Sequence, residues 1–165
     1  MTDHLIEYLS NLGLSGPAVV LILAMLPVSE LRGAIPAGIL IYQLSPWLVF
    51  FLALIGNLIP VFFILVLLKK VDRFLRQHSK FFSRILDWVY ARTRKKGQAK
   101  IKKSGLLALV LIVAIPMPFT GAWTGAVLAS LLDIPIRKAF PLIALGVFIA
   151  AIAVILITLF FNGII

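Results

Sequence analysis

Several apolar segments of this chain are too short to cross a bilayer as a helix, and one pair of charged residues lies between two of these short segments. Residues 17–28 and 34–44 contain no charged side chain, yet Glu30 and Arg32 stand between them. A charge at bilayer depth costs about 2.5–3.5 kcal/mol on insertion scales, so it persists where it is paired or faces protein or water. The pair therefore predicts a functional site. The alternative is a short polar loop at the membrane surface in which the two charges only neutralise each other.

Composition places the chain in a membrane. Hydrophobic residues make up 62% of its 165 positions, and the mean hydropathy is +1.11, well above the range of soluble domains. Of the 16 Lys and Arg residues, 13 lie in residues 69–103. A basic cluster beside membrane spans is an orientation signal that also attracts anionic lipid headgroups. We therefore predict a multi-pass protein of the cytoplasmic membrane and no nucleic-acid partner.

Two apolar stretches are long enough to cross a bilayer, and two pairs are not. Residues 46–68 and 139–161 each span 23 positions, whereas a hydrocarbon core of about 30 Å needs about 20 residues of helix. The shorter pieces pair as 17–28 with 34–44, and as 106–115 with 126–132. We expect each pair to form a re-entrant helical hairpin with a Pro/Gly-rich tip. Asn57, beside Gly56 and near Pro60, is expected to face protein.

The second half of the chain repeats the plan of the first. Gly33 matches Gly121 at an offset of 88, and Gly56 matches Gly146 at 90. The prediction is an all-α membrane domain with two inverted repeats, residues 17–68 and 105–161, joined by a basic linker at 69–103. One alternative is chance similarity among apolar segments. Another treats each hairpin as a complete crossing, which gives four helices and parallel halves.

Charge predicts the orientation. The linker should be cytoplasmic, with an amphipathic helix over residues 69–90 on that leaflet, so Gly97 is expected inside and both termini outside. Residues 3–14 have the pattern of a short interfacial helix. Arg137 and Lys138 favour the re-entrant arrangement, because it places them on the cytoplasmic side.

The two tips offer groups suited to an anion. A planar guanidinium grips phosphate or carboxylate oxygens two at a time, which fits Arg32. Thr120 and Thr124 add hydroxyls, and glycines allow a ligand to approach the backbone closely. Glu30, if it titrates, could couple binding to a proton or a sodium ion. Trp123 is either a lid over a headgroup or a packing residue.

Two stretches resemble the signatures of a known family. Residues 30–36 (ELRGAIP) and 116–125 (PMPFTGAWTG) resemble those of the small multidrug export proteins, a family distantly similar to the DedA superfamily. The resemblance implies a bacterial or archaeal membrane transporter with opposed re-entrant hairpins, acting on polyprenyl-phosphate-like lipids with ion coupling. Phe119, Thr120 and Thr124 depart from the pattern expected there. The predicted substrate or coupling residues are Glu30, Arg32, Gly33, Pro36, Asn57, Pro118, Thr120, Gly121, Trp123, Thr124 and Gly125.

Three other functions compete with lipid-phosphate transport. Export of cationic drugs would use Glu30 as the cation site, but Arg32 would neutralise it. A non-transporting scaffold anchored by the basic helix leaves the charged tip unexplained. An enzyme is not expected, because no His or Cys lies near the tips and Glu30 is the one embedded acid. No metal or cofactor is predicted, and the thin wall formed by six short membrane segments favours a homodimer.

Overall fold

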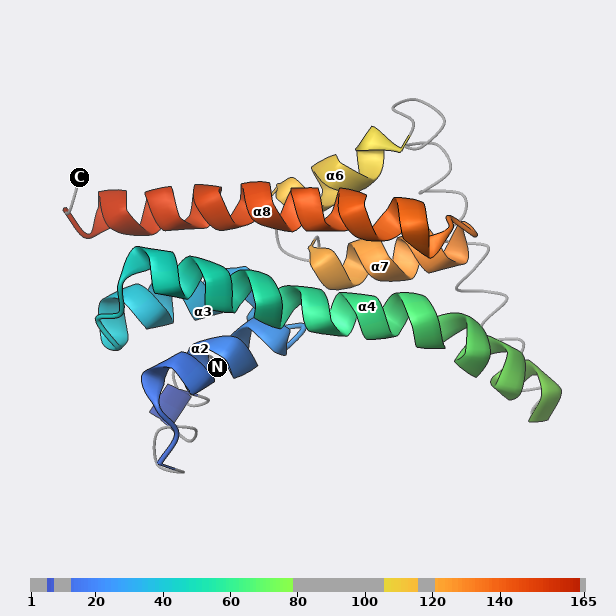
Figure 1. Ribbon diagram of the computed structural model, residues 1–165, viewed down its shortest axis with the longest axis horizontal. Coiled ribbons are helices and arrows are strands. Elements are labelled where there is room, and N and C mark those ends of the chain that lie inside the picture. Colours follow the sequence, from blue (N-terminus) through green and yellow to red (C-terminus); the bar gives the residue numbers. More distant parts are fainter. Residues whose placement is uncertain (1–5, 8–12, 79–105, 116–120, 164–165) are drawn as a thin grey trace. The chain divides into compact units, whose positions relative to one another are not determined.

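The regular structure is helical throughout the described residues, as predicted. A computed structural model describes residues 6–7, 13–78, 106–115 and 121–163, with side chains up to residue 68 in the second range. The helices are α2 (Gly16–Met25), α3 (Glu30–Pro36), the π-helical turn η1 (Ala37–Ile41), α4 (Pro46–His78), α6 (Leu107–Ala114), α7 (Ala122–Leu131) and α8 (Ile136–Phe161) (Figure 1).

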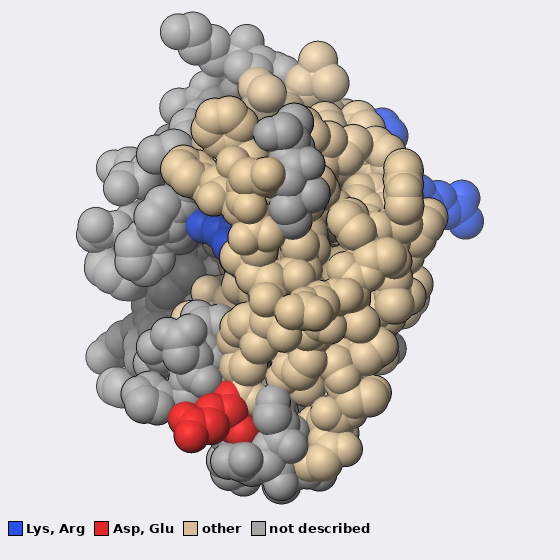
Figure 2. All heavy atoms as spheres, turned by 90° about the vertical axis from the view of Figure 1, so that its left-hand side faces the viewer, with Lys and Arg blue, Asp and Glu red and all other residues tan. Residues whose placement is uncertain are grey.

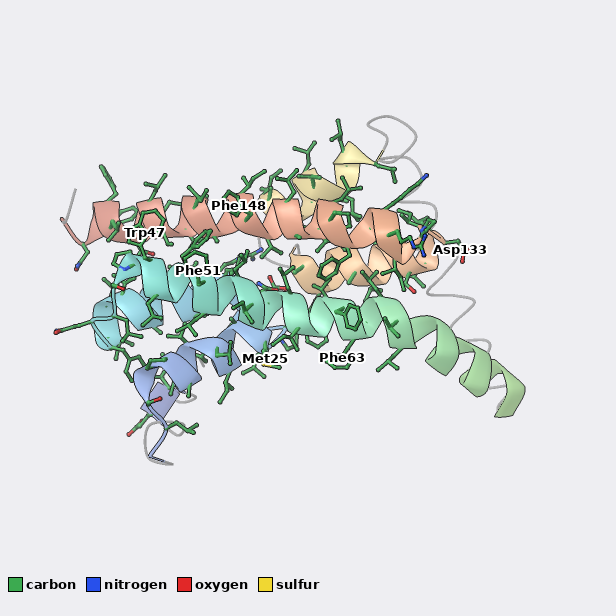
Figure 3. All side chains as sticks on the ribbon, in the orientation of Figure 1. Met25, Trp47, Phe51, Phe63, Asp133 and Phe148 are labelled. Atoms are coloured by element: carbon green, nitrogen blue, oxygen red, sulfur yellow. The ribbon has the colours of Figure 1, made fainter. Side chains whose placement is uncertain are left out.

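The two long helices are membrane-span candidates. Pro46–Leu68 in α4 and Ile136–Phe161 in α8 are long and apolar enough to cross a bilayer. The core helix of a soluble protein would be mostly buried, but only 33% and 39% of their most apolar windows are buried. Exposed apolar side chains include Phe51, Phe63 and Phe148 (Figure 3). Figure 2 shows a face whose described residues are almost all uncharged. The described part of the chain is helical, and the two predicted spans are confirmed as membrane-span candidates.

The chain divides into two compact units. One comprises Met1–Pro60 and Val147–Ile165, and the other comprises Val61–Gly146. Each unit holds a pair of short helices, α2 with α3 in the first and α6 with α7 in the second, together with the beginning of one long helix. The two long helices each contribute one end to each unit.

In the first unit, α2 packs against α3 and η1. Gly38 allows this hairpin to approach α4 closely, because a Cβ at that position would lie 2.7 Å from a methyl group of Val49. Phe50 and Phe148 meet edge to face, with ring centroids 5.4 Å apart. Small residues therefore set the helix separation, and aromatic rings fill the space beside them.

In the second unit, α6 packs against α7. A Cβ on Gly125 would lie 2.6 Å from a methyl group of Val113, so α7 touches α6 at a glycine. Phe62 and Phe140 meet edge to face at a centroid distance of 6.2 Å. The unit thus uses the same combination of close glycine contact and aromatic packing as the first.

The first helix of each hairpin ends in the same way. Its C-cap residue, Leu26 after α2 and Ile115 after α6, is extended rather than helical. A proline follows in both cases, Pro27 and Pro116, at an offset of 89. The residue before a proline is disfavoured in the helical region, so the sequence ends both helices at corresponding points.

The connections to the long helices also correspond. Gln43 and Asp133, 90 positions apart, both have left-handed backbones with φ values of 50° and 58°. The long helices then begin at Pro46 and Ile136, again 90 positions apart. Left-handed residues commonly terminate helices. In both hairpins, therefore, a left-handed residue follows the end of the second helix.

Each long helix has one glycine that contacts the first helix of the preceding hairpin. A Cβ on Gly56 would lie 2.7 Å from the carbonyl oxygen of Leu21 in α2, and one on Gly146 would lie 2.9 Å from that of Val110 in α6. The glycines are 90 positions apart and the two carbonyls 89. The two halves therefore repeat a packing contact as well as an order of helices.

The structure differs from the prediction at two kinds of boundary. The predicted tips are too long, because Glu30 and Ala122 already begin helices. Helix α4 also continues without a break past Leu68 to His78, so the beginning of the basic segment prolongs the span instead of forming a separate helix. Intrahelical hydrogen bonds do not depend on the change from apolar to basic side chains. Residues 79–105 and most of the predicted interfacial helix at 3–14 lie outside the described residues.

Candidate functional site

The turn between α2 and α3 places two charges at the beginning of a helix. After Leu26 the chain turns through Pro27 and Val28, and α3 begins at Glu30. The Ser29 hydroxyl donates to the carbonyl oxygen of Leu23, which fastens the turn to the last turn of α2. The first predicted site is therefore a compact turn with a short helix behind it.

Glu30 is buried and its backbone is strained. Its side chain is 9% exposed, and its φ of 44° lies in the left-handed region, which costs a residue other than glycine about 1–3 kcal/mol. Its position in the first turn of α3 suits a carboxylate, because backbone N–H groups there carry partial positive charge. Strained, buried ionisable residues are concentrated at functional sites.

Arg32 lies in the same helical turn and is half-buried. Both Glu30 and Arg32 take part in polar interactions in the structure. Arg32 lies within α3, and Glu30 begins that helix with a left-handed backbone. The alternative, a polar loop at the membrane surface in which the two charges neutralise each other, stays an alternative prediction. A guanidinium held at this position can present its planar donor groups to an anion.

Gly33 and Pro36 shape the remainder of the second hairpin helix. The Gly33 N–H donates to the Ser29 carbonyl at 2.9 Å, which closes the first turn of α3. Pro36 has no N–H to offer the Arg32 carbonyl, and the helix changes to the π form immediately afterwards, at Ala37–Ile41. Irregular helical turns of this kind are frequent at functional sites.

Asn57 is a buried polar residue on α4. It is 0% exposed, as predicted for a residue that faces protein. Neither its Oδ1 nor its Nδ2 has a hydrogen-bond partner among the described residues. It follows Gly56, which contacts α2 at Leu21 and Ala24. Gly56 and the turn that carries Glu30 thus both contact the C-terminal part of α2.

The second predicted site begins α7. Gly121 is the N-cap, with φ of 155° and ψ of −169°, a conformation essentially restricted to glycine. Trp123 and Thr124 occupy the first turn of α7, where Trp123 is half-buried and Thr124 is exposed. The Trp123 Nε1 is buried without a hydrogen-bond partner among the described residues. Gly125 serves packing against Val113. Pro118 and Thr120 lie outside the described residues.

The predicted residues fall into two groups. Glu30, Arg32, Gly33, Pro36 and Asn57 belong to the first unit, whereas Gly121, Trp123, Thr124 and Gly125 belong to the second. That both groups serve one ligand stays a prediction. Among the described residues no cluster of three His, Cys, Asp or Glu side chains could hold a metal ion.

The sequence analysis did not identify the buried hydroxyl groups of Ser29 and Ser130. Ser29 binds the α2 backbone, and its position directly before Glu30 at a helix start could have indicated a capping residue. Ser130, in α7, is 4% exposed, and its Oγ has no partner among the residues described. No periodicity or motif distinguishes Ser130 from its apolar neighbours.

Comparison with known proteins identifies the family. The family model described as "Putative small multi-drug export protein" matches residues 30–153, which include both hairpin signatures. The chain belongs to this family. The resemblance found in the sequence is thereby confirmed. No curated protein and no solved structure matches the chain. The match begins at Glu30, so the charged turn of α3 lies within the region that defines the family.

Proposed function

We propose that this member of the small multidrug export family transports an anionic lipid phosphate, or a similar polyprenyl-phosphate-like amphiphile, across the cytoplasmic membrane. The observation that carries the proposal is the buried Glu30 beside the half-buried Arg32 at the start of α3. This pair opens α3, directly after a helix that is too short to cross a bilayer: α2, with 10 residues, is about 15 Å long.

Arg32 is the proposed anion-binding group. Guanidinium–phosphate hydrogen bonds are charge-assisted and frequently bidentate, which gives both strength and orientation. A lipid phosphate suits a site beside a membrane, because its chain can remain in hydrocarbon while its headgroup enters the protein. Glu30 is proposed as the coupling group, whose occupancy by a proton or sodium ion changes during transport.

The proposed architecture has two re-entrant hairpins in inverted repeats. It is supported by the corresponding proline, glycine and left-handed positions at offsets of 89 and 90. With one full crossing in each repeat, the second repeat would enter from the opposite side of the membrane. Opposed hairpins would let a headgroup reach the centre from either face, which is the requirement of alternating access.

This architecture makes a topological prediction. Gly97, within the basic segment, should be cytoplasmic, and tags at Met1 and Ile165 should both be external, because basic residues are retained inside. Protease access to tags at the three positions in oriented vesicles measures this directly. A C-terminal tag on the same side as residue 97 would contradict the inverted arrangement and favour four complete crossings.

Export of organic cations is the second candidate, and the family description, which names multi-drug export, supports the export part of it. Glu30 would then be the cation site. The neighbouring guanidinium of Arg32 weakens this candidate, because a positive charge two residues away opposes the binding of a second one.

Thermal unfolding in detergent separates the two candidates. We expect a long-chain alkyl monophosphate to raise the unfolding midpoint, whereas the matching alcohol and tetraphenylphosphonium should not. The effect should be lost in Arg32→Ala and persist in Ser130→Ala, a polar control in α7 that is not among the predicted substrate residues. Stabilisation by the organic cation without stabilisation by the phosphate would reverse the assignment.

A further inference from the structure

The centre of α4 contains an unpartnered polar side chain. Asn57 is the middle residue of the candidate span Pro46–Leu68, so it lies near the bilayer midplane if α4 crosses the membrane. It is completely buried, and both atoms of its amide lack a hydrogen-bond partner among the described residues. A polar group this deep is normally satisfied by protein, water or a ligand. Asn57 therefore has hydrogen-bonding capacity that the described residues do not use.

The residue before Asn57 supplies a second acceptor. In a regular helix the carbonyl of Gly56 would accept from the N–H of residue 60, but residue 60 is a proline and has no N–H. The carbonyl of Gly56 thus lacks its usual helical donor. The Gly56 carbonyl oxygen, without its usual helical donor, and Asn57 Oδ1, without a partner among the described residues, therefore belong to adjacent residues of α4.

The C-terminal end of α2 adds negative potential at this level. Gly56 packs against Leu21 and Ala24, so the last turn of α2 lies beside this part of α4. The last carbonyls of a helix have no intrahelical donors and carry partial negative charge. The turn that follows is held to Leu23 by Ser29, and it carries the buried carboxylate of Glu30.

We propose that the end of α2 and the middle of α4 form a sodium site, with Asn57 Oδ1 and the Gly56 carbonyl oxygen among its ligands. Carbonyl and carboxylate oxygens suit a hard cation, and broken helices place them at membrane depth in transporters. Glu30 is the one acidic residue in residues 13–68, which favours a monovalent ion over a divalent one, because divalent sites commonly gather several carboxylates.

This inference rests on the proposed transport function and specifies its coupling ion. The Asn57 amide nitrogen would still be free to donate to a carboxylate or to an oxygen of the substrate. A single side chain would then contact the ion and stabilise the group next to it. Sodium binding would pre-organise the α2–α3 turn that presents Arg32.

The test is sodium-dependent thermal stability of the purified protein without substrate. Sodium chloride should raise the unfolding midpoint saturably, relative to choline chloride at the same ionic strength. Asn57→Val should lose at least about tenfold in apparent sodium affinity; valine is the residue that α8 carries 90 positions later, at the fully buried Val147. Ser130→Ala, which removes another buried and unpartnered polar group, should keep the parent's sodium response.

A second variant, Pro60→Ala, tests the sodium site if Asn57→Val does not fold. Pro60→Ala supplies the missing N–H to the Gly56 carbonyl and should weaken sodium binding severalfold while leaving Asn57 in place. Radioactive sodium binding to detergent-purified protein gives a direct measurement. An absent sodium-specific effect in the parent, or an unchanged effect in either variant, overturns the sodium site. The alkyl phosphate response measured in choline chloride tests the proposed function separately.

Discussion

The first hairpin carries Glu30 and Arg32 in the opening turn of its second helix, whereas the opening turn of α7 in the second hairpin carries Trp123 and Thr124. The same contrast continues on the long helices, where Asn57 of α4 corresponds to Val147 of α8. Both positions are fully buried. The two halves thus share the positions of helix ends and close glycine contacts, but they differ in the polar and charged side chains at those positions. Packing in this chain depends on features common to both halves, whereas a pair of charged residues in the opening turn of the second hairpin helix occurs in the first half.

The largest expected effect comes from breaking what the halves share. Gly56→Val and Gly146→Val would each force side-chain atoms onto a carbonyl of the adjacent helix, a clash of a kind that costs about 1–3 kcal/mol and occasionally more. We expect both variants to lower the unfolding midpoint in detergent by similar amounts. Ile55→Val, at an exposed position beside Gly56, is the control and should have little effect. A large loss in only one glycine variant would argue against equivalent contacts.

The next effect concerns what distinguishes the halves. Arg32→Ala removes a bidentate donor and leaves Glu30 without the guanidinium nearby, so alkyl monophosphate binding should weaken by at least about tenfold and stability should fall. Thr124→Ala in the second hairpin should weaken binding far less, because an exposed hydroxyl contributes little. Equilibrium binding to both variants measures the ratio. Equal losses of affinity would mean that the two hairpins contribute equally to binding of the anion.

The fold was predictable where covalent structure dictates it. The length and apolarity of residues 46–68 matched the span found, and Pro27 and Pro116 limit helices because each constrains the residue before it. Glycine and proline in residues 30–36 suggested an extended tip, but the turn is completed earlier, and α3 forms behind it. The basic residues after Leu68 suggested that a helix ends there, but α4 continues to His78. Backbone hydrogen bonds within a helix form whether the side chains are apolar or basic.

The sequence indicated which residues belong to the candidate site, but it did not indicate most of the contacts that these residues make. A charge within an apolar run is visible in any sequence, which is why Glu30 and Arg32 were found. The bond from Ser29 to α2 and the unpartnered Ser130 depend on how helices pack, which spacing alone does not determine. The left-handed backbone of Glu30 likewise follows from the tightness of the turn before it.

The smallest effect should come from the second hairpin. Trp123→Phe keeps an aromatic ring for packing and removes the buried Nε1 donor. If that donor meets the substrate, alkyl monophosphate affinity should fall by less than about tenfold, the value of one neutral hydrogen bond. An equilibrium titration, with Trp47→Phe on the exposed surface of α4 as the control, measures it (Figure 3). No change would assign Trp123 to packing alone.

Gradient-driven uptake of an alkyl monophosphate into proteoliposomes tests the central claim most directly, with the parent, Glu30→Gln and Arg32→Ala measured together. Glu30→Gln keeps the shape and fixes a neutral state, so it should still bind while uptake loses its dependence on the imposed proton or sodium gradient. Arg32→Ala should show its weakened binding and a matching loss of uptake at every pH. The account is contradicted if either variant, once folded and inserted, transports like the parent with unchanged pH and sodium dependence.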